Sequence, residues 1–215
     1  MALLDAYATA AEYRAMVGDG STGSDSTLDA QLLGMSRLLE RSLQVAVGQW
    51  NAHTGTYVFD GSGKAELSLR DRDGRAYFLR SIDPDLLEVD ADLDGTYEYT
   101  LDTGDAWVRG LPENAAALSE PFRAIELRPL SGALLTAFPA LPGCVRITGA
   151  WAWAAVPRAV KDLVIHRTHE VREALKAGAT MQLPSFEGAL PMQPKTAWLW
   201  HEAERLYGRR LPGIG

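Results

Sequence analysis

The chain of 215 residues has a single cysteine, Cys144, so it cannot form a disulfide within itself. This scarcity is typical of proteins that fold in a reducing compartment. No apolar run reaches the roughly 18 residues that a transmembrane helix needs. The first residues, Met1–Ala6, include an acid and no base, unlike a secretory signal. We therefore expect a soluble cytoplasmic protein without a membrane partner.

Positive charge is also in short supply, because 21 basic residues stand against 28 acidic ones, a formal charge of −7. This balance argues against a general binder of the phosphate backbone, which needs a net basic face. Between Asp60 and Asp105 there are 13 acids and five bases, whereas from Val156 onward there are nine bases and six acids. Attraction between these regions of different subunits is one interpretation, and a solvated acidic surface is the other.

What the chain has in abundance is apolar residues, 47% of the total, enough to form a core. Thr9 and Glu12 have the spacing of a capping box, which predicts a short helix that ends at the turn-forming segment Gly18–Ser24. Asp25 or Ser26 then caps a helix of about five turns. Its apolar residues recur at spacings of three and four: Leu28, Leu32, Met35, Leu39, Leu43 and Ala46.

From about Trp50 the apolar period changes to two, which predicts short β-strands. The turn pairs between them are typical of hairpins: Asp60-Gly61, Asp73-Gly74, Asp94-Gly95 and Thr103-Gly104. A further strand is expected over 122–127. The last strand, 144–153, is expected to place four residues on one face: Val145, Ile147, Trp151 and Trp153. The spacing predicts a small antiparallel sandwich or barrel.

Pro157 can open a helix, because its missing amide donor costs nothing in the first turn. An apolar stripe runs from Val160 to Leu175, Gly178 is the expected stop, and a final helix covers 195–207. The predicted class is α+β: a small bundle of about four helices, interrupted by an antiparallel β-rich insertion. We assign residues 1–50 and 156–215 to the helical domain and residues 51–155 to the insertion.

The motifs that could carry chemistry are weak. Asp90, Asp92 and Asp94, followed by Gly95, match the opening of a calcium loop, but Leu101 stands where a bidentate Glu is needed. The alternative is a hairpin tip whose aspartates face water, so we treat these three residues as weak metal candidates only.

Other catalytic or cofactor signatures are incomplete. The G-x-G-x-x-G match at 18–23 follows a helix instead of a strand, so we interpret it as an interhelical loop. His166 and His169 lack a third metal ligand, and Cys144 has no histidine partner nearby in the sequence. We expect no catalytic site and no cofactor.

Six tryptophans are many for this length, and two of them lie in the last predicted helix. Trp198 and Trp200 are two apart, so they face different sides and one is left exposed. Exposed aromatics favour an interface, although burial of both by the preceding segment is the competing interpretation. A basic ending follows, with Arg205, Arg209 and Arg210.

Several segments together resemble a known family. The long helix carries Ser36–Arg41, and the β-region ends in Val145–Pro157, which leads directly into a helix. This order is similar to the head–tail connector (adaptor) proteins of long-tailed bacteriophages and gene transfer agents, in which V-x-V-T-G-x-[FWY]-G-[WY]-x-x-V-P precedes a main helix. The segment 105–115 and the ending Arg205–Arg210 also resemble that family. Ala152 departs from the pattern where glycine is usual, and Gly208 interrupts the basic ending.

The resemblance implies a structural virion protein that forms a twelve-fold ring between the portal and the next neck or tail-completion protein. DNA passes through the lumen of such a ring without sequence-specific binding. The expected location is the neck of the particle, and the host cytoplasm during assembly. The resemblance implies docking through the C-terminal segment, and we expect its interface residues to be Trp198, Trp200, Arg205, Arg209 and Arg210. The alternatives are a ligand- or carbohydrate-binding β-module on a helical base and a metal-assisted hydrolase that uses the aspartates near Asp90.

Overall fold

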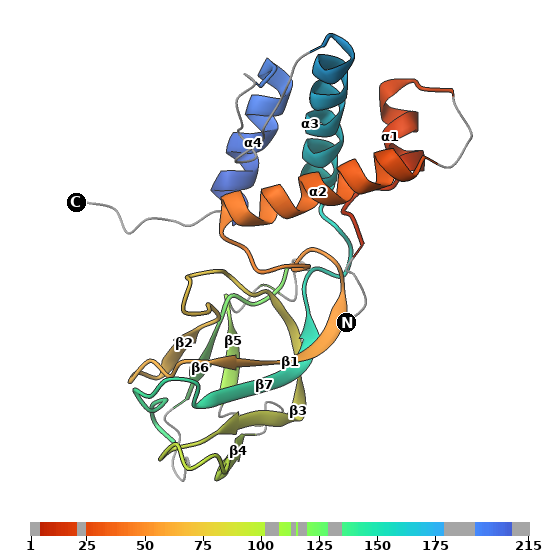
Figure 1. The fold of residues 1–215 in the computed structure, drawn as a ribbon. Coiled ribbons are helices and arrows are strands. Elements are labelled where there is room, and N and C mark those ends of the chain that lie inside the picture. Colours follow the sequence, from red (N-terminus) through yellow and green to blue (C-terminus); the bar gives the residue numbers. More distant parts are fainter. Residues whose placement is uncertain are drawn as a thin grey trace, which may run out of the picture. The chain divides into compact units, whose positions relative to one another are not determined.

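The chain folds into two compact units, seen in a computed structural model (Figure 1). Met1–Gly48 with Val156–Gly215 form one, which we call the helical unit, and Gln49–Ala155 form the other, the β unit. The predicted α+β class is confirmed. No helix among the described residues is long and apolar enough to cross a membrane. The structure describes residues 5–20, 25–101, 108–112, 115, 120–128, 135–178 and 192–207.

Helix α1, Ala10–Val17, begins at the predicted capping box. The Glu12 amide donates to the Thr9 hydroxyl over 3.2 Å, and the Thr9 amide donates to the Glu12 carboxylate over 2.9 Å. Gly18 ends the helix at φ 74°, in the left-handed region where glycine is favoured. The sequence thus predicts both ends of α1.

Helix α2, Ser26–Leu43, begins at Asp25, whose carboxylate accepts from the Leu28 amide over 2.9 Å. It ends at Gln44, which is left-handed with φ 53°, while the Val45 amide donates back to the Glu40 carbonyl. The prediction that Ala46 belongs to the helical stripe is therefore wrong. Leu28, Leu32, Met35, Leu39 and Leu43 are buried as expected.

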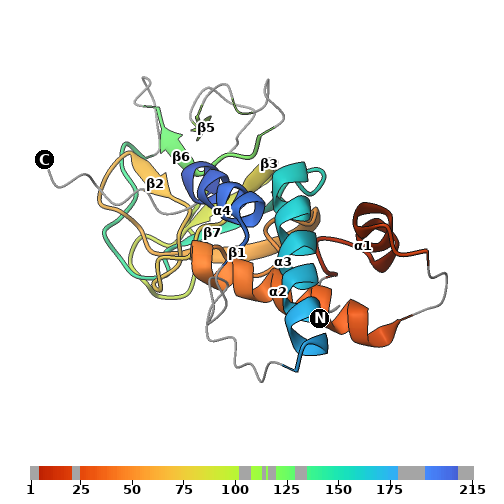
Figure 2. The same cartoon turned by 90° about the horizontal axis from the view of Figure 1, so that it is seen from above.

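Helix α3, Arg158–Lys176, follows Pro157 as expected and packs against α1, α2 and α4. Figure 2 shows α4, Pro194–Tyr207, beside α3, with α2 running across them. Val160, Leu163 and Val164 are fully buried on α3, so this helix forms the centre of the helical unit.

A buried polar cluster ties the end of α2 to the chain on either side of it. The Glu40 carboxylate accepts from the Tyr7 hydroxyl, from Arg37 over 2.5 Å and from the Gly48 amide over 2.6 Å. All three donors reach the same oxygen, Oε1. Burial raises the pKa of Glu40 above its usual range, against the opposing effect of these donors.

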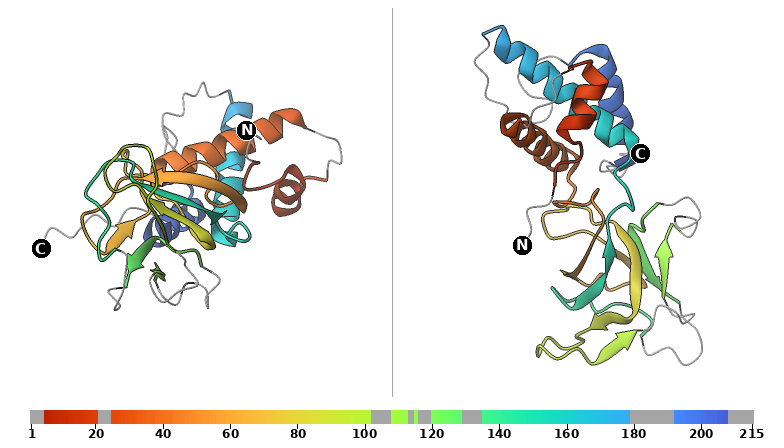
Figure 3. Two further views of the ribbon diagram at one scale, coloured as in Figure 1. Left: turned by 90° about the horizontal axis from the view of Figure 1, so that it is seen from below. Right: turned by 90° about the vertical axis from the view of Figure 1, so that its right-hand side faces the viewer.

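The β unit consists of two antiparallel sheets, which Figure 3 shows from two further directions. The four-stranded sheet has the order β1-β7-β3-β4, with β1 at His53–Phe59, β7 at Val145–Trp151, β3 at Leu79–Val89 and β4 at Tyr99–Leu101. The three-stranded sheet has the order β2-β6-β5, with β2 at Glu66–Ser68, β6 at Ala124–Leu127 and β5 at Val108–Leu111.

Both sheets contribute side chains to one apolar core, which is a sandwich arrangement, one of the two that the sequence predicts. Val145, Ile147 and Trp151 of β7 are all buried, in the alternation expected of a strand with one face on the core. The Trp151 indole donates to the Gly55 carbonyl over 2.9 Å, so its polar atom is satisfied. Leu67 of β2 and Ile125 of β6 join the same cluster from the second sheet.

Two details of this region differ from expectation. Trp153 lies beyond the end of β7, because Ala152 takes a left-handed conformation with φ 70° and turns the chain. Trp153 packs edge-on against Phe78 instead of extending the β7 face. Strand β5 was not predicted, since its sequence Val-Arg-Gly-Leu has no clear alternation.

Candidate interaction surfaces

Helix α4 presents one face to α3 and another to solvent. Leu199, Trp200 and Ala203 are buried. Glu170 of α3 fixes the start of α4, because its carboxylate accepts from the Thr196 hydroxyl over 2.5 Å and from the Gln193 amide over 3.1 Å. Glu170 thus anchors the first turn of α4 to α3.

Glu170 also pairs with Arg167, whose side chain is fully buried on α3, over 2.8 Å. A buried ion pair adds little net stability over an apolar pair, but removal of one partner leaves an unpaired buried charge. The pair therefore makes the position of α4 on α3 sensitive to substitution at Glu170.

The two tryptophans of α4 differ in exposure, as expected from their spacing. Trp198 is 65% exposed, whereas Trp200 is 4% exposed. Arg205 lies on the exposed side and pairs with Glu202 over 2.6 Å, which lowers the pKa of that carboxyl. Arg209 and Arg210, the other predicted interface residues, lie outside the described residues. Of the three predicted interface residues that the structure describes, Trp198 and Arg205 are thus accessible and Trp200 is not.

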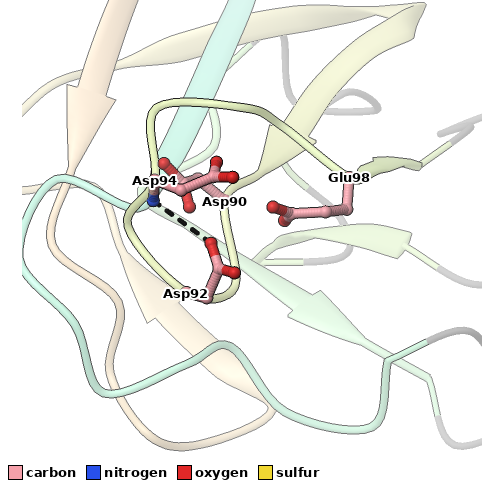
Figure 4. Close-up of side chains that lie close together, drawn as sticks. All are labelled: Asp90, Asp92, Asp94 and Glu98. Atoms are coloured by element: carbon pink, nitrogen blue, oxygen red, sulfur yellow. Dashed lines mark hydrogen bonds between the residues drawn. The ribbon is translucent and has the colours of Figure 1, made fainter.

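The three weak metal candidates do come together, at the turn between β3 and β4. Oxygens of Asp90, Asp92, Asp94 and Glu98 all lie within 4.8 Å of one another (Figure 4). Carboxylate oxygens are the ligands that calcium and magnesium prefer. These four residues are therefore the ones that could hold a divalent cation, although acidic hairpin turns also occur without one.

Each of these carboxylates already accepts backbone hydrogen bonds that shape the turn. Asp90 accepts from the Leu93 amide over 2.6 Å and from the Gly95 amide over 3.1 Å. Asp92 accepts from the Asp94 amide over 3.1 Å. The alternative interpretation, in which all three aspartates face water, does not hold for Asp90, which is 5% exposed because its two oxygens accept from amides inside the turn.

The sequence interpretation missed Glu98. It looked for a ligand at Leu101, the twelfth position of a helix–loop–helix site, but Leu101 lies in β4 and is buried. In a hairpin the returning strand begins sooner, so the ninth position, Glu98, faces the aspartates, and its carboxylate accepts from the Ala91 amide over 2.8 Å.

A surface pocket of about 320 Å³ lies elsewhere on the β unit. Asp60 is fixed in it by two donors, Arg72 over 3.0 Å and the Gly143 amide over 2.7 Å. Arg72 holds the pKa of the Asp60 carboxyl below its usual range. We call this the acidic pocket, and it is lined by Val58, Asp60, Asp71, Arg72, Asp73 and Gly143.

One of the two histidines of α3 has a structural partner. His169 Nδ1 lies 3.1 Å from the Tyr13 hydroxyl, which joins α3 to α1. Burial, assisted by Lys195, lowers the pKa of His166. Cys144 is buried, and burial raises the pKa of its thiol, so the reactive thiolate is disfavoured.

Comparison with known proteins found similarity to solved structures, but none to protein families or curated sequences. No protein-family model matches the chain. No curated protein sequence matches it either. Among solved structures, the chain is similar to one in the neck of an empty GTA particle computed with C6 symmetry. The two chains are 19% identical, with a TM-score of 0.49 over 95% of this chain and 92% of the other.

Proposed function

We propose that the protein is a head–tail connector (adaptor) in the neck of a phage-like particle. In this role it forms a ring between the portal and the next neck or tail protein, and DNA passes through the ring. Ring formation, portal binding and DNA passage all belong to the proposal. It is supported by the family-like sequence segments and, above all, by the backbone at Ala152.

Ala152 is the position at which the family pattern Val145–Pro157 commonly has glycine, and this chain has alanine. Its φ of 70° lies in the left-handed region, where glycine is the favoured residue. The Ala152 amide donates to the Phe78 carbonyl over 2.6 Å, which holds the turn between β7 and α3. The chain thus has the backbone conformation that explains a glycine in the pattern, although its own residue differs. This observation carries the proposal.

The contacts of a ring follow from its symmetry. Neighbouring subunits in a closed ring meet through two different surfaces, one on each side. We propose that the C-terminal segment docks on a neighbour or on the portal through Trp198 and Arg205, with Arg209 and Arg210 beyond them. Trp200 has a supporting role, because its burial on the inner side of α4 holds this surface in place. The resemblance gives twelve subunits.

Passage of DNA requires that the surface lining the channel does not bind phosphate groups. The β unit, Gln49–Ala155, holds 16 acidic and nine basic residues, a difference of −7, so the whole formal charge of the chain lies in this unit. Acidic surfaces repel the DNA backbone and let it slide. We propose a structural role in the virion without catalysis or a cofactor, and a cytoplasmic stage during assembly.

Electron microscopy of the protein mixed with purified portal, or with tail-less capsids, tests the proposal. We expect an additional ring of density at the portal vertex. A chain that ends before Lys195, with folding checked by circular dichroism, is expected to lose that density. A bare vertex with the intact, folded chain would contradict the connector role.

A further inference from the structure

Helix α4 carries an exposed aromatic residue among charged ones. Lys195, Trp198, Glu202 and Arg205 are spaced by three and four residues, so they share one face of the helix. We call this face the α4 knob. Its indole is 65% exposed, which is uncommon for tryptophan outside a contact surface. With two bases and one acid, the α4 knob has a formal charge of +1.

The acidic pocket has the complementary features. Val58 of β1 lines it and is 51% exposed, which provides an apolar contact. Asp60, Asp71 and Asp73 together with Arg72 give its lining a formal charge of −2. Arg75, which pairs with Asp73 over 3.2 Å, reduces the local charge to −1, so the pocket stays net acidic. Its volume of about 320 Å³ is at the lower end of the roughly 300–1,000 Å³ range of small-molecule pockets, which is in keeping with a single large side chain.

More negative charge lies close to the pocket. Gly143 lines it, and the carbonyl of the next residue, Cys144, accepts from the Asp90 amide over 2.9 Å. The carboxylate cluster of Asp90 and its neighbours is therefore at the same end of the four-stranded sheet. Both groups of carboxylates thus lie at one end of this sheet, and both attract a basic surface that approaches it.

We infer that the α4 knob of one copy docks into the acidic pocket of the next copy in the ring. The inference rests on the proposed connector function, and it names the two different surfaces that a closed ring requires. Charge complementarity selects a second copy as the occupant, since the pocket and the knob have opposite net charge. Trp198 contacts Val58 in this interface, and Lys195 and Arg205 face the pocket carboxylates.

Cross-linking tests which copies meet. Chains with His201→Cys, three residues from Trp198 on α4 and exposed, and chains with Val58→Cys are mixed with tail-less capsids and treated with a short bis-maleimide. The Trp198 indole itself stays in place. The native Cys144 is buried and stays unreactive. We expect a product that joins two copies and that appears only after assembly. Leu175→Cys, at a position 44% exposed on α3, replaces His201→Cys as the matched control and gives no product.

Two substitutions test the energetics of the same contact. Val58→Lys places a bulky positive charge in the pocket and is expected to weaken ring binding about tenfold or more, as for a central interface residue. Thr54→Lys is the control, because Thr54 is exposed on the same face of β1 but does not line the pocket. It is expected to change binding by less than about twofold. Circular dichroism confirms that both variants are folded.

The outcomes separate this inference from the connector function. Ring density without the cross-link, or with equal effects of Val58→Lys and Thr54→Lys, overturns the inference and leaves the connector role intact. A cross-link within single unassembled chains that carry both His201→Cys and Val58→Cys also overturns it, because the pocket is then filled by its own chain. Absence of ring density with the intact chain removes the connector role, and the inference with it.

Discussion

Ala152 is a single residue whose backbone conformation can be tested directly. A left-handed conformation costs alanine about 1–2 kcal/mol, whereas glycine adopts it freely but loses about 0.5–1 kcal/mol through the entropy of the unfolded chain. Ala152 is also fully buried, so loss of its methyl group costs about 0.8 kcal/mol. Because these effects offset one another, we expect Ala152→Gly to leave the free energy of unfolding unchanged within about 0.5 kcal/mol. Urea denaturation measures the change.

Ala150→Gly is the matched control, because Ala150 lies in β7 with an ordinary strand conformation. Glycine in a strand interior is expected to cost about 1 kcal/mol there. Equal destabilisation by the two variants would mean that the chain has no left-handed turn at Ala152, and the main support for the connector proposal would be lost.

Glu40 is a second residue whose environment predicts a measurable effect. Burial raises its pKa in the folded chain above that in the unfolded chain. As the pH rises through the ordinary range of a glutamate, the unfolded chain therefore loses this proton first, and stability falls until the folded pKa is passed. We expect Glu40→Gln to lack this decline, with a difference in slope of at most about 1.4 kcal/mol per pH unit.

Urea denaturation of both chains between pH 4 and 7, an interval chosen around the usual glutamate pKa of about 4.3, checks this expectation. Asp29→Asn on the same helix controls for the loss of one carboxyl, since Asp29 is exposed on α2. Parallel pH profiles for wild type and Glu40→Gln would show that Glu40 is not held in an unfavourable environment.

Among the elements, the turn between β3 and β4 distinguishes a structural role from a metal-dependent one. Asp92 is exposed and accepts one backbone hydrogen bond, from the Asp94 amide. Its removal also relieves repulsion from three neighbouring carboxylates. We expect Asp92→Ala to change the free energy of unfolding by less than about 0.5 kcal/mol and to leave ring density at the portal unchanged.

Thermal unfolding and electron microscopy measure the two effects. Asp29→Ala is the control, because Asp29 is an exposed aspartate outside both the carboxylate cluster and the acidic pocket. A hydrolytic activity that depends on a divalent metal and disappears in Asp92→Ala would instead support the metal-assisted hydrolase.

The predictability of each element depended on whether its signal was local. Both ends of α1 can be predicted from the sequence, because the Thr9 cap and the left-handed Gly18 each act within one turn of the helix. Strand β5 was missed because packing far along the chain determines it. A Cβ atom on Gly110 would come within 2.4 Å of the Phe122 ring, so this position needs glycine, yet nothing in the sequence near Gly110 shows it.

The candidate surfaces show the same limit. Local spacing predicts that Trp198 or Trp200 is exposed, and the chemistry of Asp90 and its neighbours is visible in the sequence. Glu98 and the acidic pocket required the fold, because hairpin geometry and a contact between residues 60 and 143 bring their parts together. Sequence patterns thus identified candidate side chains, whereas their partners depended on register and topology.

For the whole molecule, the decisive property is the formal charge of −7, which lies entirely in the β unit. A connector through which DNA passes must not bind the DNA tightly, and a net negative charge disfavours such binding. We expect no binding of a labelled DNA duplex at physiological salt, with any dissociation constant above the range of about 10⁻⁴–10⁻⁶ M that is typical of non-specific binders. Fluorescence anisotropy measures this in the free protein.

A variant with Asp90→Asn, Asp92→Asn and Asp94→Asn provides the graded control, because it changes the formal charge from −7 to −4. At physiological salt this variant is expected to bind DNA no better than the wild type. As the salt concentration is lowered, it is expected to show weak binding at a concentration at which the wild type shows none, because electrostatic repulsion matters most where screening is weakest. Micromolar binding by the wild type, weakening steeply with salt, would reveal a cationic surface and contradict passage of DNA without retention. In that case the protein itself would hold the DNA at the neck, and a separate trigger would be needed to release it.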